Sequence, residues 1–362
     1  MLRRRFLALG AGASLALAQK KQDDTIIATA TQDSTPRVGI VLSSFKEGEE
    51  HDGTKIPGLS DPKPPGADLT SAQLDAWVRK AIDLASLRSK EFGEVVEAED
   101  WVVVKTRIPA RGAPASVTDP RIVRTVVSYL AERKRGLRFT VVESAEQANA
   151  WDMDWGGAFD GLTYRKMIGD LSARFPGVRF EIADLNSAER LDLPVPGKAL
   201  ARNNPAGVYR VPKIIQQCDR LISIAPLATD AATGVALSLK NYMGIAPQDG
   251  LLKLGSPDEI IIDLFSYRPA DLALVGGCWG VEGDGARVHH NVLVAGMKAV
   301  AVDSVAAAVM GFKPGDLPFL ALGEKKGFGA WDIDEIWTRG NDVEEARREF
   351  KKPGGWQAPA KK

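Results

Sequence analysis

Apolar residues in the first half of the chain follow two alternating patterns. Short, mainly apolar runs at residues 37–42, 101–104 and 139–142 predict buried strands. Apolar positions that recur every three or four residues after Thr70, and again after Pro120, predict helices. A capping box opens the first helix at Thr70, and the Thr-Asp pair before Pro120 can cap the second. Strands that alternate with helices in this way indicate an α/β protein.

The alternation continues through the second half of the chain. Further strands are predicted at residues 180–185, 208–211, 220–224, 272–275 and 292–295, and helices at 233–243, 257–265 and 302–310. Residues 43–69 and the glycine-rich run GGCWGVEGDGA are predicted to be loops. We therefore expect a three-layer fold with a mixed, mostly parallel sheet and helices on both faces. It could form one body or two lobes that meet at a cleft.

The first residues have the features of an export signal. Three consecutive arginines precede a Phe-Leu pair, and an uncharged apolar stretch then ends in a small-residue Ala-Leu-Ala site. The stretch is shorter than the roughly 20 residues that span a bilayer. The pattern predicts a twin-arginine signal peptide at residues 1–18, recognised by the twin-arginine export machinery. It places the mature protein in the periplasm or outside the cell, without membrane attachment after cleavage. A helical N-terminal arm is the alternative.

The remaining boundaries follow from local composition. Residues 19–35 are polar without a periodic apolar pattern, which predicts a disordered leader. Residues 36–353 carry the alternating elements and predict one α/β domain, and residues 354–362 form a polar tail.

Composition narrows the chemistry. Lysine plus arginine and aspartate plus glutamate each number 47, so net charge gives no reason to expect nucleic acid or an anionic membrane as a partner. Cys218 and Cys278 are too few for a four-thiolate site; we expect two buried thiols, with a disulfide as the alternative. Histidine is limited to His51, His289 and His290. We find no nucleophile elbow, P-loop, zincin or dinucleotide-binding motif.

Polar residues gather where predicted strands end, which is where open α/β sheets bind ligands. Lys105 and Arg107 follow one strand, and Glu143 ends the next. The helix that begins after Thr118 and Asp119 would direct its free N–H groups toward the same place. This combination suits an anion. Two ordinary solvated cations are the alternative.

Two further segments carry candidate groups. Lys240 and Asn241 follow the apolar stretch VALSL, where core packing does not explain a lysine. Glu282 and Asp284 lie in a glycine-bearing loop and could offer oxygen ligands to Mg²⁺ or Ca²⁺. A plain Asp-Gly turn explains that loop equally well.

These motifs resemble the bacterial and archaeal domain-of-unknown-function family 362. The matching segments lie between Val102 and Pro353 and have the order and spacing of that family. They are VVVKTR with Lys105, TDPRIVR from Thr118, LISIAPLATDAATGVALSLKNYMGIAP with Lys240 and Asn241, VEGDGA with Glu282, AGMKAVAVDSVAAAVMGF with Asp303, and DIDEIWTRG.

The chain also departs from that family. Ala228 and Asp230 stand where the family commonly has Lys and His, and Gly276 and Lys298 stand where it commonly has Asp. Many members carry an added ferredoxin segment. This chain shows none, and its cysteines lack ferredoxin spacing, so no iron–sulphur cluster is expected.

The leading hypothesis is an exported, enzyme-like protein that binds a small anionic ligand in a strand-end cleft, with or without a divalent metal. The candidates are Lys105, Lys240, Asn241 and Glu282 as catalytic residues, Arg107, Thr118, Asp119 and Asp303 as ligand-binding residues, and Glu282 with Asp284 as metal ligands. One alternative is a non-catalytic exported binding protein that has lost family active-site residues. The other is a cofactor-bearing redox partner.

Overall fold

The computed structural model describes residues 35–50, 53–86, 91–109, 114–144 and 149–358. The predicted signal peptide, most of the predicted leader, and His51 lie outside the described residues. From Thr35 onward the chain forms one compact unit.

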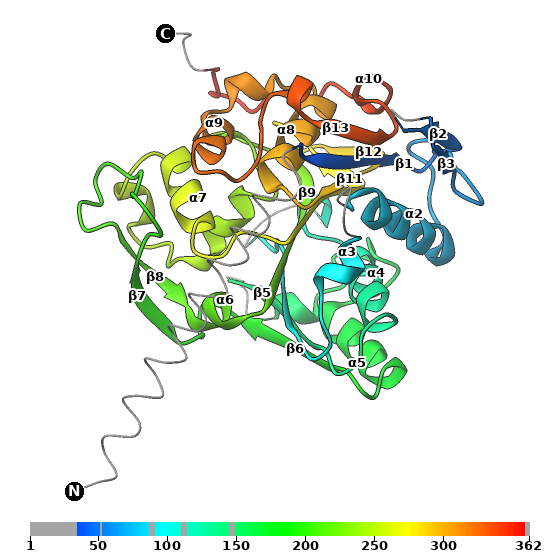
Figure 1. Cartoon of the computed structure of the whole chain (residues 1–362), viewed down its shortest axis with the longest axis horizontal. Coiled ribbons are helices and arrows are strands. Elements are labelled where there is room, and N and C mark those ends of the chain that lie inside the picture. Colours follow the sequence, from blue (N-terminus) through cyan, green and yellow to red (C-terminus); the bar gives the residue numbers. More distant parts are fainter. Residues whose placement is uncertain (1–34, 51–52, 87–90, 110–113, 145–148, 359–362) are drawn as a thin grey trace, which may run out of the picture. The chain divides into compact units, whose positions relative to one another are not determined.

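A sheet of nine strands runs through the described part of this unit (Figure 1). Its order is β13-β1-β12-β11-β9-β4-β5-β6, with β10 added beside β9. The strands are β1 (Arg37–Leu42), β4 (Trp101–Lys105), β5 (Arg138–Glu143), β6 (Arg179–Asp184), β9 (Arg220–Asp230), β10 (Gly234–Val235), β11 (Leu272–Val281), β12 (Arg287–Gly296) and β13 (Trp337–Gly340). β12 is antiparallel to both neighbours and β10 is antiparallel to β9, while the other pairs are parallel. The predicted mixed, mostly parallel sheet is confirmed.

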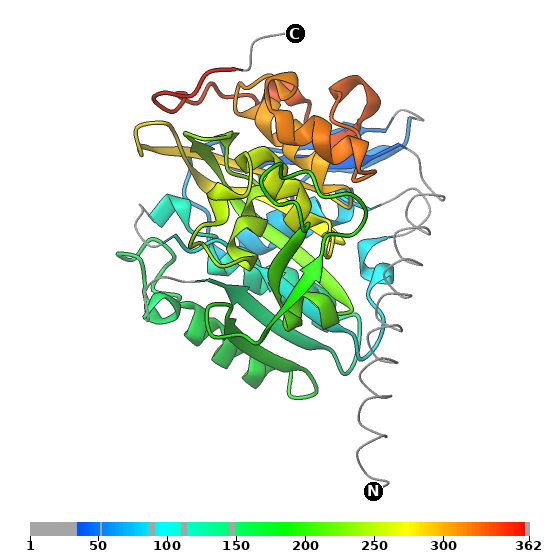
Figure 2. The same ribbon diagram turned by 90° about the vertical axis from the view of Figure 1, so that its left-hand side faces the viewer.

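Helices cover both faces of the sheet, as predicted (Figures 1 and 2). One face carries α2 (Ser71–Leu84), α4 (Pro120–Ala131) and α5 (Tyr164–Arg174), and the other carries α7 (Pro257–Phe265), α8 (Ala299–Val309) and α9 (Pro318–Lys325). Val102 and Val104 of β4 pack in the first core, and Val103 packs in the second. Because successive strand residues point to opposite faces, the two cores lie on opposite sides of β4.

Local signals explain where the main helices begin. Thr70 and Ser256 form capping boxes ahead of α2 and α7, and Asp119 caps α4 with Pro120 at its first position. Shorter elements complete the described chain. They are α3 (Phe92–Val95), α6 (Lys213–Gln217), α10 (Val343–Ala346) and the 3₁₀ turns η1 (Pro114–Ser116), η2 (Ala150–Asp152), η3 (Lys240–Ile245), η4 (Leu251–Lys253), η5 (Pro314–Asp316) and η6 (Ile333–Glu335).

Four segments differ from the sequence-based expectation. The predicted loop 43–69 contains a small hairpin of β2 (Glu47–Glu49) and β3 (Lys55–Pro57), and the strand β8 (Val208–Pro212) has an unforeseen partner in β7 (Arg190–Pro194). Residues 233–243 do not form a helix: they form β10 and begin η3.

The glycine-rich run is also not a loop, because β11 continues through it to Val281 and pairs with β12. Gly276 lies there at φ 124°, and a Cβ would approach the carbonyl oxygen of Val292 to 2.1 Å. Only glycine fits that close backbone approach.

The strand order reverses between β4 and β9. From β4 the chain passes through α4 to β5 and on to β6 at one side of the sheet. From β9 it passes through α7, on the opposite face, to β11 at the other side. The carboxyl ends of β4 and β9 therefore form a topological switch point, the usual ligand position in open α/β sheets.

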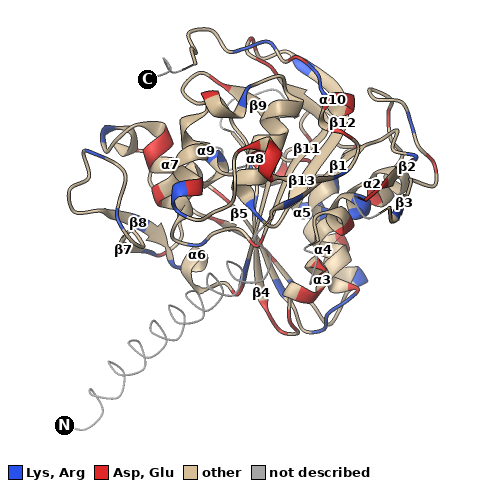
Figure 3. Ribbon diagram, turned by 45° about the horizontal axis from the view of Figure 1, so that its top comes forward, with Lys and Arg blue, Asp and Glu red and all other residues tan. Residues whose placement is uncertain are grey.

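The described chain has neither a segregated charge distribution nor a membrane-spanning helix. Basic and acidic residues are interspersed along the ribbon, in keeping with the balanced charge (Figure 3). Among the described residues, no helix has both the length and the hydrophobicity needed to cross a bilayer.

Candidate functional site

Lys105 is the last residue of β4 and is only 1% exposed. Its Nζ donates hydrogen bonds to Glu143 Oε1 (2.8 Å), the carbonyl oxygen of Thr106 (2.7 Å) and Asn241 Oδ1 (3.1 Å). Burial lowers the pKa of Lys105, and the charge of Glu143 opposes that shift. An ammonium group has three N–H donors, so these bonds use all of them. All hydrogen-bond donors of the Lys105 ammonium group are therefore bound to protein oxygens.

Glu143 closes this ion pair from the end of β5. Its Oε2 accepts a hydrogen bond from the backbone N–H of Ile108 (3.1 Å), and its Oε1 accepts one from the backbone N–H of Ser144 (2.7 Å). Gly244 of η3 lies directly against the pair, since a Cβ there would come within 2.8 Å of Glu143 Oε1 and 3.1 Å of Lys105 Nζ. The close approach of η3 leaves no space for a ligand atom at that point.

Asn241 ties η3 to two strands. Its Nδ2 donates to the carbonyl oxygen of Lys105 and to Ser223 Oγ, both at 3.1 Å. The Ser223 hydroxyl in turn donates to the carbonyl oxygen of Ser238 (3.0 Å). Because both ends of its amide are engaged, Asn241 acts as a positioning group in this arrangement.

Arg107 lies two residues beyond Lys105 and has very different surroundings. Its backbone N–H donates to Thr118 Oγ1 (2.8 Å), and the Thr118 hydroxyl donates to the carbonyl oxygen of Ile224 (2.8 Å). The guanidinium group makes no ion pair with any described residue, and its buried Nη1 has no hydrogen-bond partner among them. Burial lowers the pKa of Arg107, while the charges of Asp230 and Glu143 oppose that shift.

Lys240 is paired but partly exposed. Its Nζ lies 2.7 Å from Asp230 Oδ2, and the two side chains are 21% and 22% exposed. Asp230 Oδ1 accepts hydrogen bonds from the backbone N–H groups of Ala232 and Thr233 and from the Thr233 hydroxyl. One contact leaves Lys240 with two donors for other partners.

The charges of this region do not cancel among the described residues. Glu143 neutralises Lys105, and Asp230 neutralises Lys240. Arg107 interacts electrostatically with both carboxylates but is paired with neither. Among these five described side chains, the positive charges therefore exceed the negative charges by one.

Asp303 of α8 is fully buried and contacts the residues that precede η3. Its Oδ1 accepts hydrogen bonds from the backbone N–H (3.0 Å) and the hydroxyl (2.5 Å) of Ser238, and its Oδ2 accepts one from the N–H of Leu239 (2.9 Å). Burial raises the pKa of Asp303 to about 7, and these three donors oppose the rise. Asp303 thus fixes the segment that leads into Lys240 and Asn241.

Asp119 occupies the N-terminus of α4. It accepts a hydrogen bond from the backbone N–H of Arg121 (2.8 Å) and pairs with the Arg121 guanidinium (2.7 Å), which also contacts Asp160 (2.7 Å). The N–H groups proposed to attract an anion are thus partly satisfied by this carboxylate.

Glu282 and Asp284 lie at the turn between β11 and β12, where they contact the C-terminal segment. Glu282 Oε2 accepts from the backbone N–H of Lys351 (2.9 Å), and Asp284 Oδ2 pairs with Lys351 Nζ (2.6 Å). No described group of three or more His, Cys, Asp or Glu residues could hold a metal ion. The metal site predicted from these two carboxylates stays a prediction.

The other candidate side chains take part in packing. His289 stacks on Trp279 with ring centroids 4.0 Å apart, and His290 Nε2 lies 2.8 Å from the carbonyl oxygen of Ala346. Burial lowers the pKa of both histidines. Cys218 and Cys278 are free and buried, and burial raises the pKa of each thiol to about 12.

Comparison with known proteins agrees with the motifs. A family model described as Domain of unknown function (DUF362) matches residues 102–308, which is more than half of the chain. The chain belongs to the DUF362 family. The matched range includes the charged residues at the ends of β4, β5 and β9 and also Asp303. A search of curated proteins gives no match.

Among solved structures, this DUF362 protein is similar to the lactate racemase apoprotein from Thermoanaerobacterium thermosaccharolyticum. The TM-score is 0.39 and the sequence identity is 14%, over 72% of this chain and 61% of the racemase chain. The chain therefore spans less than two thirds of the length of that protein.

Three features of this DUF362 site escaped sequence reasoning. Asp230, interpreted as the loss of a basic family residue, is the ion-pair partner of Lys240. Glu143 was noted only as a polar strand end, yet the parallel register that pairs Lys105 with Val142 places it beside that lysine. Gly244 is the third, because no sequence feature used above distinguishes it, yet it lies against the Lys105–Glu143 pair. A prediction that β4 and β5 are adjacent would have found the Lys105–Glu143 pair.

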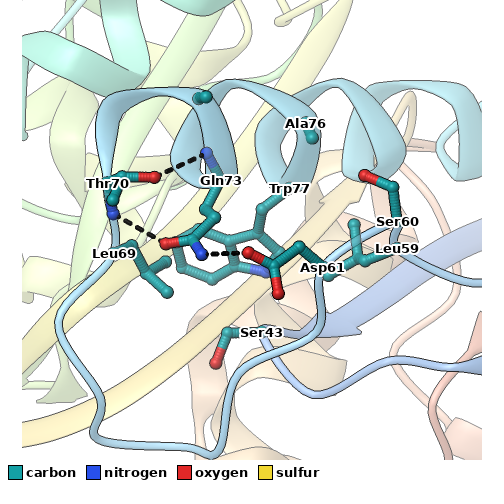
Figure 4. A pocket seen from close by; sticks show the side chains of 10 residues that line it. Ser43, Leu59, Ser60, Asp61, Leu69, Thr70, Gln73, Ala76 and Trp77 are labelled. Carbon is teal, nitrogen blue, oxygen red and sulfur yellow. Dashed lines mark hydrogen bonds between the residues drawn. The ribbon is translucent and has the colours of Figure 1, made fainter.

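A pocket of about 160 Å³ lies elsewhere, between α2 and the segment before it (Figure 4). Thr70 and Gln73 of the capping box line it, and Gln73 also donates to Asp61. The indole N–H of Trp77 donates to the carbonyl oxygen of Val41 (2.8 Å). The walls of this pocket are therefore formed by the N-terminal cap of α2 and by the packing of α2 on β1.

Proposed function

We propose that this member of the DUF362 family binds a small anion beside the ends of β4 and β9. Arg107 receives the negative charge. The observation that carries the proposal is the buried Nη1 of Arg107, which has neither a hydrogen-bond partner nor an ion pair among the described residues.

The Arg107 side chain as a whole is half-buried, but a charged group with a buried donor atom that lacks a partner is unfavourable, and proteins normally match such a group with an opposite charge. The two nearby carboxylates are already engaged by Lys105 and Lys240. An anionic ligand would therefore complete the set of charges. Arginine suits this role because its planar fork binds carboxylate and phosphate groups through two parallel hydrogen bonds.

The other candidate residues fall into two groups, according to whether they still have hydrogen-bond donors free for a ligand. Lys240 keeps two N–H donors and is a second ligand contact. Lys105, Glu143 and Asn241 are fully engaged with one another and support the site from behind. Because the buried lysine has no free donor, the arrangement favours ligand binding over catalysis by Lys105, and we assign no reaction.

Titration calorimetry of the full chain at low ionic strength tests the proposal, with inorganic phosphate and acetate as separate probes. We expect saturable binding of at least one anion. Arg107→Met should weaken it by about tenfold or more, since a hydrogen bond to a charged group contributes roughly 1.5–3 kcal/mol. Arg135→Met is the matched control, because Arg135 is exposed elsewhere. If neither anion binds, or if Arg107→Met binds equally well, the proposal is wrong.

We also propose export by the twin-arginine route, which rests on the sequence of residues 1–18. Residues 1–35 fused to a reporter that folds in the cytoplasm should deliver the reporter to the periplasm. Replacing all three arginines with lysine should stop that delivery. A reporter that stays in the cytoplasm with the native segment would contradict the proposal.

A further inference from the structure

A second cavity lies apart from the contacts of Arg107. It has a volume of about 270 Å³ and is bounded by the turn after β9, the starts of α7 and α9, and the C-terminal segment. Thr233, Asp258, Pro318 and Trp356 are among the residues that line it. This volume is large enough for a small organic molecule, and Asp258 is the single ionisable residue of the described lining.

Asp258 is only partly satisfied by the protein. It is the second residue of α7. The backbone N–H of Phe319, at the start of α9, donates a hydrogen bond to its carboxyl group. Its Oδ1 is buried and has no hydrogen-bond partner among the described residues, and no described lysine or arginine forms an ion pair with it. A helix cap alone would account for one carboxylate oxygen and leave the other without a donor.

Burial raises the pKa of Asp258 to about 6, and the Phe319 N–H opposes that shift. The ionised carboxylate at neutral pH is therefore held in surroundings that disfavour its charge. A positive group placed beside it would relieve that penalty, whereas an anion would increase it.

The aromatic side of the cavity also suits a positive group. Trp356 packs edge to face against Phe312 with ring centroids 5.3 Å apart, and Lys352 Nζ lies 5.6 Å from each ring. These rings already accept one ammonium group at a distance typical of cation–π contacts. Trp356 also packs closely on Gly234, where a Cβ would come within 2.7 Å of the indole.

We infer that this cavity binds an ammonium group, with Asp258 as its counter-ion and Trp356 as its aromatic wall. A metal ion fits less well, because one carboxylate is far from the six to eight oxygen ligands of Ca²⁺. The inference does not require the anion proposed at Arg107, although Ala232 and Thr233 of this cavity also donate hydrogen bonds to Asp230, the partner of Lys240. The same chemistry could come from a free amine or from Lys361 and Lys362, which follow Gln357 in sequence and lie outside the described residues.

The test is titration of the full chain at pH 7.5 with n-butylammonium chloride, with butan-1-ol as the neutral analogue and sodium chloride as the salt control. We expect the amine to bind and the alcohol to bind at least about tenfold more weakly. Asp258→Asn should weaken amine binding about tenfold, and Trp356→Leu about threefold to tenfold. Asp334→Asn is the matched control, since Asp334 is exposed in η6.

A Lys361→Gln/Lys362→Gln variant separates the two sources. Binding to the native chain identifies a free amine as the ligand, and binding only to this variant identifies the tail as the native source. Equal binding of amine and alcohol overturns the inference. So does unchanged amine affinity in Asp258→Asn, or no amine binding to either the native chain or the tail variant. Thermal unfolding of each variant without amine checks that it is folded.

Discussion

Lys105 and Arg107 leave the same strand two residues apart, yet the fold treats their charges in opposite ways. Lys105 is fully buried and gives all three of its N–H donors to protein oxygens. Arg107 has a buried Nη1 that no described residue receives. The charge of Lys105 is neutralised by Glu143, whereas the charge of Arg107 has no ion-pair partner among the described residues. A cation at a strand end is therefore a candidate ligand contact only when the fold does not already use its donors.

Lys105→Met should produce the largest loss of stability in this region. The substitution leaves the Glu143 carboxylate buried without its counter-ion, and breaking a buried pair in this way costs about 3–5 kcal/mol. Urea unfolding measures the effect. The double variant Lys105→Met/Glu143→Gln should recover much of the loss, because the unpaired charge is gone. A single variant as stable as the native chain would show that the pair is not a structural element.

Asp303 allows the same comparison for a buried acid. Burial raises the pKa of Asp303 from its ordinary value of about 3.8 to about 7 in the folded chain. Folding therefore favours the protonated acid. The stability that it contributes is fully present below about pH 4 and is lost as the pH rises through about 7. The loss is on the order of 4 kcal/mol, since each pKa unit is 1.36 kcal/mol.

Asp303→Asn cannot titrate, so its free energy of unfolding should fall less than that of the native chain between pH 4 and pH 8. Parallel urea unfolding curves across that range test this sign. Identical pH dependence in both proteins would mean that the three donors from Ser238 and Leu239 keep Asp303 ionised throughout.

The fold was more predictable than the site because strands and helices leave local patterns. The capping boxes and the run RVGIVL need only a few adjacent residues, and β1 and α7 were placed correctly. The glycine-flanked segment 233–243 is predicted to be a helix, and this prediction is wrong. Its conformation is instead set by contacts from β9 and Asp303, which no short window of sequence contains.

Which site residues are already hydrogen-bonded within the protein depends on contacts between residues that are far apart in the sequence. Lys105 meets Asn241 across 136 positions of sequence, and Ser238 meets Asp303 across 65. The sequence selected polar residues at strand ends, which is where the topology gathers them. The sequence could not show which of these side chains already have their N–H donors bound to protein oxygens. That property follows from the register of three strands and from the close approach of η3.

Gly244→Ala should destabilise the chain by about 2 kcal/mol through overpacking. The added methyl group would meet Glu143 Oε1 at 2.8 Å, Ser144 Oγ at 3.0 Å and Lys105 Nζ at 3.1 Å. Gly169→Ala is the matched control, because nothing lies within 4 Å of its Cβ position in α5. That control should gain roughly 0.5–1 kcal/mol from helix propensity. Equal effects in the two variants would show that η3 can move away from the ion pair.

Arg107→Met should have the smallest effect on stability and the opposite sign to Lys105→Met. It removes a charge that no described group neutralises, so without ligand the free energy of unfolding should stay level or rise by up to about 1 kcal/mol. A saturating anion should stabilise the native chain by mass action and leave the variant unchanged. Urea unfolding of both proteins, with and without phosphate, measures the two effects together. A loss of several kcal/mol without phosphate would mean that Arg107 is as structural as Lys105, and the contrast between the two cations would disappear.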